Sequence, residues 1–531
     1  MIHSRSFRNS LLAFSAITAT VLTVWIYHYG PSWPYRDSYA YIYYMDQIRS
    51  GAFHVIDLPT VRNNEHLVGF HYAFAMASLW VSNMRSKIIL FENAALLVGS
   101  GVLIALTLRK SQIGKQWPIL LSLVSIIPLL NPSQTSYLLW EFQIWWYLDF
   151  FLLAASLYLV ERFAMRAYLL VVLFSALATM SEAQGSFLWL SSGMHFLLLS
   201  RDEKAKRVST KTGIAVMAVH CLIFGAAAVL LLKGNTPAAP ALAKAPTLIQ
   251  RLFSHVDYFV KLMGGGFGVN SEPVALVFGS VSLLALAYFV IVTLRPRWSI
   301  EIRMAFLLTS LPLLWSVAFA VGRERYGIPW AFSDFHASPM LVPFFIGLSI
   351  YALVCAHQSN ILRRSIAVAL AVGFAIVPDL TAIPFGHSQS HQMHMSSMMG
   401  IAANCHNGNY SRYLIQHLDG LETHDVLFDL TRRDLPSLCA VQQDPAQWIP
   451  LVQPPEIFVA LSKRDSRTNE ALRVLWDVYL THLDLRMAFP WPDPSLGQTL
   501  INFAANYAEM GSPYETQVLA PYQDVYPKLR P

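Results

Sequence analysis

The stretch VALVFGSVSLLALAYFVIVTL, residues 274–294, decides the class of fold. It holds no charged residue, and as an α-helix it is long enough to cross the roughly 30 Å of hydrocarbon in a bilayer. The basic residues of RPR, residues 295–297, follow it directly. This pattern is typical of a transmembrane helix that ends at a membrane surface.

Similar apolar runs recur along the chain of 531 residues, of which 55% are hydrophobic and 13% charged. Soluble domains carry about a quarter charged residues. The length alone would fit two or three soluble domains, but the apolar runs exclude them. We therefore expect an all-α membrane protein with about eleven transmembrane helices, near residues 10–28, 87–108, 116–131, 143–160, 167–180, 186–200, 212–232, 274–294, 304–321, 338–357 and 364–383.

Lysine and arginine are distributed unevenly between the two sets of loops. Short loops on the side of the N-terminus hold 17 of them, and the longer loops on the opposite side hold 11. Because basic residues favour the cytoplasmic side, we expect a cytoplasmic N-terminus and an extracytoplasmic chain from about Pro384 onwards. The net charge of +6 lies in loops between spans, so no nucleic-acid partner is expected. Leu11 to Tyr29 is interpreted as a first span and not as a cleaved signal peptide.

Two domains are expected: a polytopic transmembrane domain, 1–383, and an extracytoplasmic C-terminal domain, 384–531. The first outside loop, 29–86, is predicted to hold short helices over Tyr39–Ser50 and Val68–Val81. Alternatively, the second of these is a span, which would reverse the orientation downstream and fit the loop charges less well. The Pro/Ala-rich stretch NTPAAPALAKAP indicates a mobile outside loop over 233–273.

The four cysteines fit this topology. Cys221 and Cys355 lie inside expected spans and are interpreted as core thiols. Cys405 and Cys439 both lie in the C-terminal domain, where a disulfide between them is one possibility and two buried free thiols the other.

Polar clusters interrupt the apolar pattern on the outside. Asp37, in PYRDSYAYIYYMDQ, follows the first span and is a candidate general base; the alternative is a solvated loop acid or a helix cap. Glu65 and His66, in DLPTVRNNEHLVGFH, are a candidate acid/base pair, metal pair or phosphate-binding pair; the alternative is helix capping.

Three further outside clusters carry candidate substrate-binding residues. Glu141 and Gln143 lie in WEFQIWW, where tryptophans form either an interfacial belt or a surface on which a sugar stacks. Glu182 lies in the tight turn SEAQG. Arg323 and Arg325, in GRERYG, are candidates for binding a phosphate, or else reach the membrane surface paired with Glu324.

No metal site or cofactor is expected. The sequence holds no HExxH or DxD motif, and the histidines His387, His391 and His394 lack a compact ligand spacing. A divalent metal remains possible but is not indicated.

The arrangement of RDS, NNEH, WEFQIWW, SEAQG and GRERYG resembles that of the GT-C superfamily of membrane glycosyltransferases, in its bacterial, polyprenyl-phosphate-sugar-dependent type. The resemblance implies a multi-pass protein of the bacterial inner membrane. It would move a sugar from a polyprenyl-phosphate donor to an envelope glycan or lipid on the outer face. By this resemblance Asp37 would activate or position the acceptor hydroxyl, and Arg323 or Arg325 would neutralise the leaving phosphate. Asp37 departs from the family pattern because it has no neighbouring acid.

Other functions stay open. A polymerase or ligase of surface polysaccharide would also be polytopic and rely on outside arginines. A transporter or flippase would have charged residues near the midplane, for which Glu92 and Asp149 are the main candidates. Paired repeats, a further feature of such proteins, are not found in the sequence. A non-catalytic envelope scaffold would tolerate the loss of Asp37.

Overall fold

The computed structural model describes residues 2–30, 38–63, 66–82, 87–202, 207–232, 248–268, 271–293, 298–323, 338–357, 359 and 361–406. The chain divides into two compact units, residues 1–30 with 51–390, and residues 31–50 with 391–531. In the second unit the described elements are α2 (Tyr39–Arg49) and the end of α17 (Ile361–His406). The expected domain boundary at residues 383 and 384 therefore falls within a continuous helix.

Among the described residues of the first unit, the regular structure is helical apart from one short ladder. Strands β1 (Arg62–Asn63) and β2 (His66–Leu67) pair antiparallel, with Arg62 opposite Leu67. The first half of the unit holds α1 (Ile2–Tyr29), η2 (Val55–Thr60), α3 (Gly69–Val81), α4 (Lys87–Leu108), α5 (Gln112–Gln116), α6 (Pro118–Ile126), η3 (Ile127–Leu130), η4 (Pro132–Gln134), α7 (Thr135–Leu138), η5 (Glu141–Gln143) and α8 (Ile144–Phe163).

The second half of the first unit holds η6 (Ala164–Ala167), α9 (Tyr168–Thr179), η7 (Ala183–Ser186), α10 (Phe187–Ser200), α11 (Thr210–Leu232), α12 (Leu248–Gly265), α13 (Glu272–Thr293), α14 (Ile300–Arg323), α16 (Ser338–His357) and the first part of α17.

Seven of the described helical segments are long and apolar enough to cross a membrane, which confirms the class of an all-α membrane protein. They are Arg5–Tyr29, Lys87–Leu108, Pro118–Leu138, Thr210–Leu230, Glu272–Val292, Ile300–Val321 and Ile361–Pro384, and Leu341–His357 is a shorter apolar helix. Each of the eleven expected spans coincides with helix, although α9 is about 18 Å long at 1.5 Å per residue. Eleven crossings remain a prediction.

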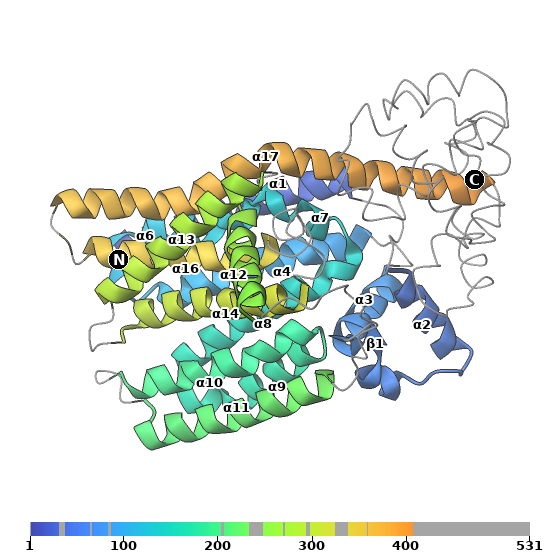
Figure 1. The fold of residues 1–531 in the computed structure, drawn as a ribbon, viewed down its shortest axis with the longest axis horizontal. Helices are drawn as coiled ribbons and strands as arrows, with labels where there is room; N and C mark the ends of the chain where they lie inside the picture. The colour runs from blue at the N-terminus through green and yellow to red at the C-terminus, as the bar shows by residue number, and fades with distance from the viewer. Residues whose placement is uncertain are drawn as a thin grey trace. The chain divides into compact units, whose positions relative to one another are not determined.

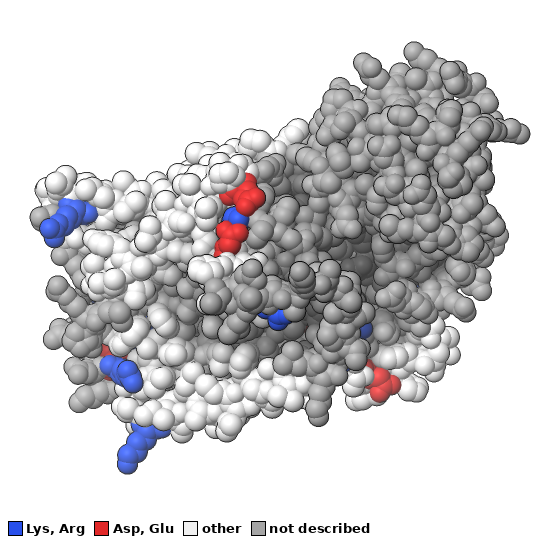
Figure 2. Space-filling model, viewed as in Figure 1, with Lys and Arg blue, Asp and Glu red and all other residues white. Residues whose placement is uncertain are grey.

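The long helices run side by side (Figure 1). Helix α1 packs on α4 and α6, α4 on α8, α10 on α11, and α14 on α16. Charged side chains are few on the face shown in Figure 2, where white surface predominates among the described residues. Many exposed side chains are large and apolar, such as Leu169, Leu222 and Ile291, as expected of helices that face lipid.

One end of the first unit carries the basic loops, and we name it the basic end. It comprises the junctions α4–α5, α8–α9, α10–α11, α13–α14 and α16–α17. Polar contacts join these junctions: the Gln112 N–H donates to Glu301 Oε1 at 2.7 Å, and the His357 ring hydrogen-bonds to the Gln116 side chain. The N-terminal half of α1 reaches this end as well, since Ser10 Oγ lies 3.0 Å from Ser122 Oγ in α6.

The opposite end, which we name the aromatic end, holds the elements of the first outside loop that belong to this unit. Both helices expected in that loop are present: α3 belongs to this unit, and α2 belongs to the second unit. Helix α3 has 13 residues, about 20 Å, which is too short for a span and supports the loop interpretation. The ladder lies near the end of α11, because Arg62 Nη2 donates to the Leu230 carbonyl at 3.1 Å.

The interpretation of both span cysteines as core thiols is right for Cys355 and wrong for Cys221. Cys355 is buried, whereas Cys221 is exposed on α11. The predicted disulfide between Cys405 and Cys439 lies outside the described side chains.

Candidate functional site

At the aromatic end, the turn that leads into α8 holds buried polar and acidic side chains. A short 3₁₀ turn, η5, places Glu141 and Gln143 just before the helix, and Asp149 follows in its second turn. Glu141 is fully buried, and Gln143 and Asp149 are 7% and 2% exposed. Burying three polar side chains in one stretch is costly unless they bind other groups, so this turn is a candidate site.

Aromatic rings enclose these polar groups. Trp145 and Trp146 stack at 4.0 Å between centroids, and Trp146 meets Trp315 of α14 edge-on at 5.6 Å. Phe142 of the turn packs against His71 of α3 at 5.3 Å. Rings from α3, α8 and α14 therefore lie next to the turn or next to one another.

The turn between α9 and α10 brings the second predicted cluster to the same place. The Trp315 Nε1–H donates to the Gln184 carbonyl at 2.8 Å, and the His71 ring hydrogen-bonds to the Ser181 carbonyl. The carboxyl groups of Asp149 and Glu182 lie close enough to interact electrostatically. Clusters that are 40 residues apart in sequence thus meet at one site.

Several buried polar atoms in this site have no hydrogen-bond partner among the residues that the structure describes. They are Oε1 of Gln143, Oε1 of Gln184, both carboxyl oxygens of Asp149, and the indole nitrogens of Trp145 and Trp146. Buried polar groups in proteins are nearly always paired, so a group of unpaired donors and acceptors needs an explanation. Donors and acceptors beside aromatic rings are what a bound polyhydroxylated molecule would need.

Gly185 makes the tight turn possible. A Cβ atom at this position would lie 1.9 Å from the backbone oxygen of Ala178. We expect Gly185→Ala to lower the free energy of unfolding by about 1–3 kcal/mol through overpacking, measured as thermal unfolding in detergent. Gly225→Ala is the matched control, because a Cβ there meets no atom within 4 Å. Equal stability of the two variants would contradict this packing.

The remaining predicted site residues are not placed. Asp37, Glu65 and Arg325 lie outside the described residues, and so do the side chains of His66 and Arg323. Of His387, His391 and His394, only His387 has a described side chain, which packs edge-on against Tyr29 at 6.4 Å. Among the described residues no group of three or more His, Cys, Asp or Glu side chains is placed to hold a metal ion.

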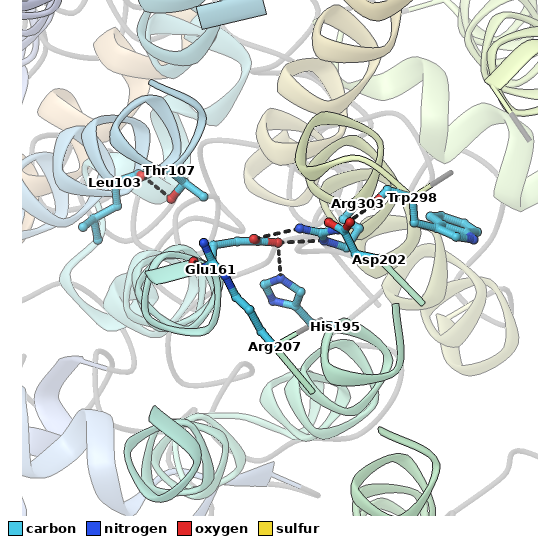
Figure 3. A network of polar contacts seen from close by, with 8 residues as sticks. All are labelled: Leu103, Thr107, Glu161, His195, Asp202, Arg207, Trp298 and Arg303. Atoms are coloured by element: carbon cyan, nitrogen blue, oxygen red, sulfur yellow. Dashed lines mark hydrogen bonds and ion pairs between the residues drawn. The ribbon is translucent and has the colours of Figure 1, made fainter. Parts of the chain in front are cut away.

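A second buried polar network, at the basic end, was not expected from the sequence (Figure 3). Arg303 donates from Nε and Nη2 to both carboxylate oxygens of Glu161, at 2.8 and 2.9 Å. Its Nη1 donates to Asp202 Oδ2 at 2.7 Å, and His195 Nε2 lies 2.9 Å from Glu161 Oε1. Arg207 also donates to the Glu161 backbone carbonyl.

This network differs from the site at the aromatic end because its charges are paired with one another. Both carboxylate oxygens of Glu161 and three nitrogens of Arg303 have partners. Such a network is typical of a structural joint between helices, here α8, α10 and α14. In the sequence, Arg303 is only one of many basic loop residues, so nothing distinguished it.

Comparisons with family models, curated proteins and solved structures find no match to this chain. The functional interpretation therefore depends on the residues themselves.

Proposed function

We propose that the protein is a membrane glycosyltransferase that moves a sugar from a polyprenyl-phosphate donor to an envelope glycan or lipid. The observation that carries the proposal is a group of buried donors and acceptors beside the tryptophans of the aromatic end, which have no partner within the described part of the chain. In this proposal Glu141, Gln143 and Glu182 bind the sugar. Asp37 acts on the acceptor hydroxyl, and Arg323 or Arg325 neutralises the donor phosphate.

Two further observations support this proposal. The site lies at the end of the helices opposite the basic loops, which would face the cytoplasm, so it would open to the extracytoplasmic side. It also lies at the end of apolar helices, where the head group of a lipid-linked sugar would be found. The protein would then reside in the bacterial inner membrane with its C-terminal domain outside.

The first test compares cells that carry the wild-type gene with cells that lack it. Mass spectrometry of envelope glycans and of polyprenyl-phosphate sugars should show one glycan residue lost and one lipid-linked sugar accumulated in the deletion strain. Accumulation of a lipid-linked oligosaccharide instead would indicate a polymerase or ligase. If neither pool changes, the glycosyltransferase proposal fails.

Glu182→Gln tests the role of the site itself. Removing the charge while keeping the shape should weaken substrate binding by about 1.5–3 kcal/mol, as for a hydrogen bond to a charged group. That corresponds to a fall in kcat/KM of roughly ten- to a hundredfold, mainly through KM. The measurement is transfer by purified protein in lipid nanodiscs.

Glu301→Gln is the matched control for that experiment. Glu301 is a buried glutamate at the basic end, where its Oε1 accepts from the Gln112 N–H, and a glutamine oxygen can accept the same bond. We expect this variant to keep wild-type transfer. If Glu182→Gln is as active as Glu301→Gln, Glu182 does not belong to the substrate site.

A further inference from the structure

Helix α12 (Leu248–Gly265) lies in the stretch that the sequence indicated as a mobile outside loop. Its axis runs across those of α14 and α16 (Figure 1). If those helices cross the bilayer, a helix that runs across them lies close to the membrane plane. The direction of α12 therefore differs from that of the neighbouring candidate spans.

The C-terminal half of α12 is fixed to the first unit. Asn131 Nδ2 donates to the Gly266 carbonyl at 2.8 Å, and Ser133 Oγ donates to the same carbonyl at 3.3 Å. Helices α12 and α13 also touch through their backbones, because a Cβ on Gly264 would lie 1.9 Å from the Ala275 oxygen. This half therefore cannot move away without breaking packed contacts.

A buried lysine strengthens that attachment. Lys261 is only 5% exposed in its side chain and forms ion pairs with Asp257 of α12 and Glu272 of α13. These ion pairs join α12 to α13.

The N-terminal half of α12, in contrast, exposes large apolar side chains. Leu252, Phe253 and Val256 are 60%, 71% and 51% exposed, and they share one helix face by their three- and four-residue spacing. The adjacent Arg251 is exposed as well. Large apolar side chains gathered on one exposed face of a helix mark an interaction surface.

The neighbouring helix α13 indicates the environment of this face. Helix α13 packs against α12 and itself exposes Val277, Val281 and Leu284 by 60%, 53% and 69%. Because α13 is a candidate membrane span, its exposed face is suited to acyl chains. The apolar face of α12 belongs to a helix that packs directly against this candidate span.

We propose that α12 is an in-plane membrane helix whose Leu252, Phe253 and Val256 insert among the acyl chains of one leaflet. Arg251 would extend to the lipid phosphates, as basic residues beside an apolar helix face do. The segment 248–265 would then belong to the membrane-embedded part of the protein and not to a loop in water. This inference does not depend on the glycosyltransferase proposal.

The test is a spin label at position 253 in the full chain, reconstituted into phosphatidylethanolamine/phosphatidylglycerol nanodiscs. Phe253→Cys is made in a background in which the four native cysteines are replaced by alanine. We expect the label to collide several-fold more with oxygen, which concentrates in lipid, than with a water-soluble nickel chelate. Val256→Cys, on the same face, provides a second position if the first variant folds poorly.

Two positions calibrate the measurement. Leu284→Cys, on the exposed face of α13, should report lipid, and Asp57→Cys, at an exposed acid of η2, should report water. A label at 253 that behaves like the one at 57 would overturn the proposal. Low collision rates with both reagents would also overturn it, because they would show that protein, such as a second copy of the chain, covers the face.

Discussion

Arg303→Ala is expected to be the most destabilising single substitution at the basic end. The substitution leaves Glu161, whose side chain is 5% exposed, and Asp202 without the guanidinium that pairs with both. Removing one partner of a buried ion pair costs about 3–5 kcal/mol, because the remaining charge stays buried. Thermal unfolding in detergent, with size-exclusion chromatography to measure the folded fraction, is the appropriate measurement.

Arg201→Ala is the control for that substitution. Arg201 lies at the same end and carries the same charge, but it is exposed, so its loss should change stability by less than about 1 kcal/mol. A variant with glutamine at both 161 and 303 should lose less stability than the two single variants together, because neither charge is then left unpaired. Equal stability of Arg303→Ala and Arg201→Ala would show that the network does not hold the helices together.

The spans and the outside helices were predictable because they depend on local sequence. An apolar run such as 274–294 has one stable form in a bilayer, a helix, whatever its neighbours. Helix α3 was likewise found within one residue of its expected start. These features need only the periodicity and length of one segment.

The polar networks were only partly predictable because they depend on which helices become neighbours. Glu141, Gln143 and Glu182 were predictable as candidates because they are polar residues where apolar spans meet the outside, and the structure brings their segments together. Trp315 could not be predicted as part of the site, because tryptophan is common in membrane spans. Only the structure shows that its indole N–H donates to the Gln184 carbonyl. The pairing of Glu161 with Arg303 could not be predicted for the same reason. The two residues are 142 positions apart, and charged residues at the ends of spans are common.

Helix α12 could not be predicted from the sequence for a different reason. The Pro/Ala-rich stretch before it suggested that the whole of 233–273 was a loop. The helical part lacks an uninterrupted apolar run, because Arg251, Asp257 and Lys261 occur in it. Two of these charges pair with each other, and Lys261 also reaches Glu272 of the next helix, which the segment alone does not show.

Asp37→Asn should abolish sugar transfer while leaving the protein folded and inserted. If Asp37 is the base that acts on the acceptor hydroxyl, an amide of the same size removes the proton acceptor without changing the volume. General base catalysis contributes roughly 10²–10⁴-fold, so kcat should fall by that factor. The KM for the donor should change little, in contrast to Glu182→Gln, because Asp37 would contribute to the chemical step and Glu182 to binding.

Asp57→Asn distinguishes this role from a general effect of acids in the first outside loop. Asp57 is an exposed acid of η2 in the same loop, so its neutralisation should leave transfer unchanged. Cells with Asp37→Asn should accumulate the same lipid-linked sugar as the deletion strain, at a normal level of membrane-inserted protein. Full transfer by Asp37→Asn would exclude Asp37 as the base but not the glycosyltransferase function, because the deletion strain tests that function separately. Loss of transfer in both aspartate variants would instead indicate that the loop needs its negative charge as a whole, and the assignment of the base to Asp37 would then be wrong.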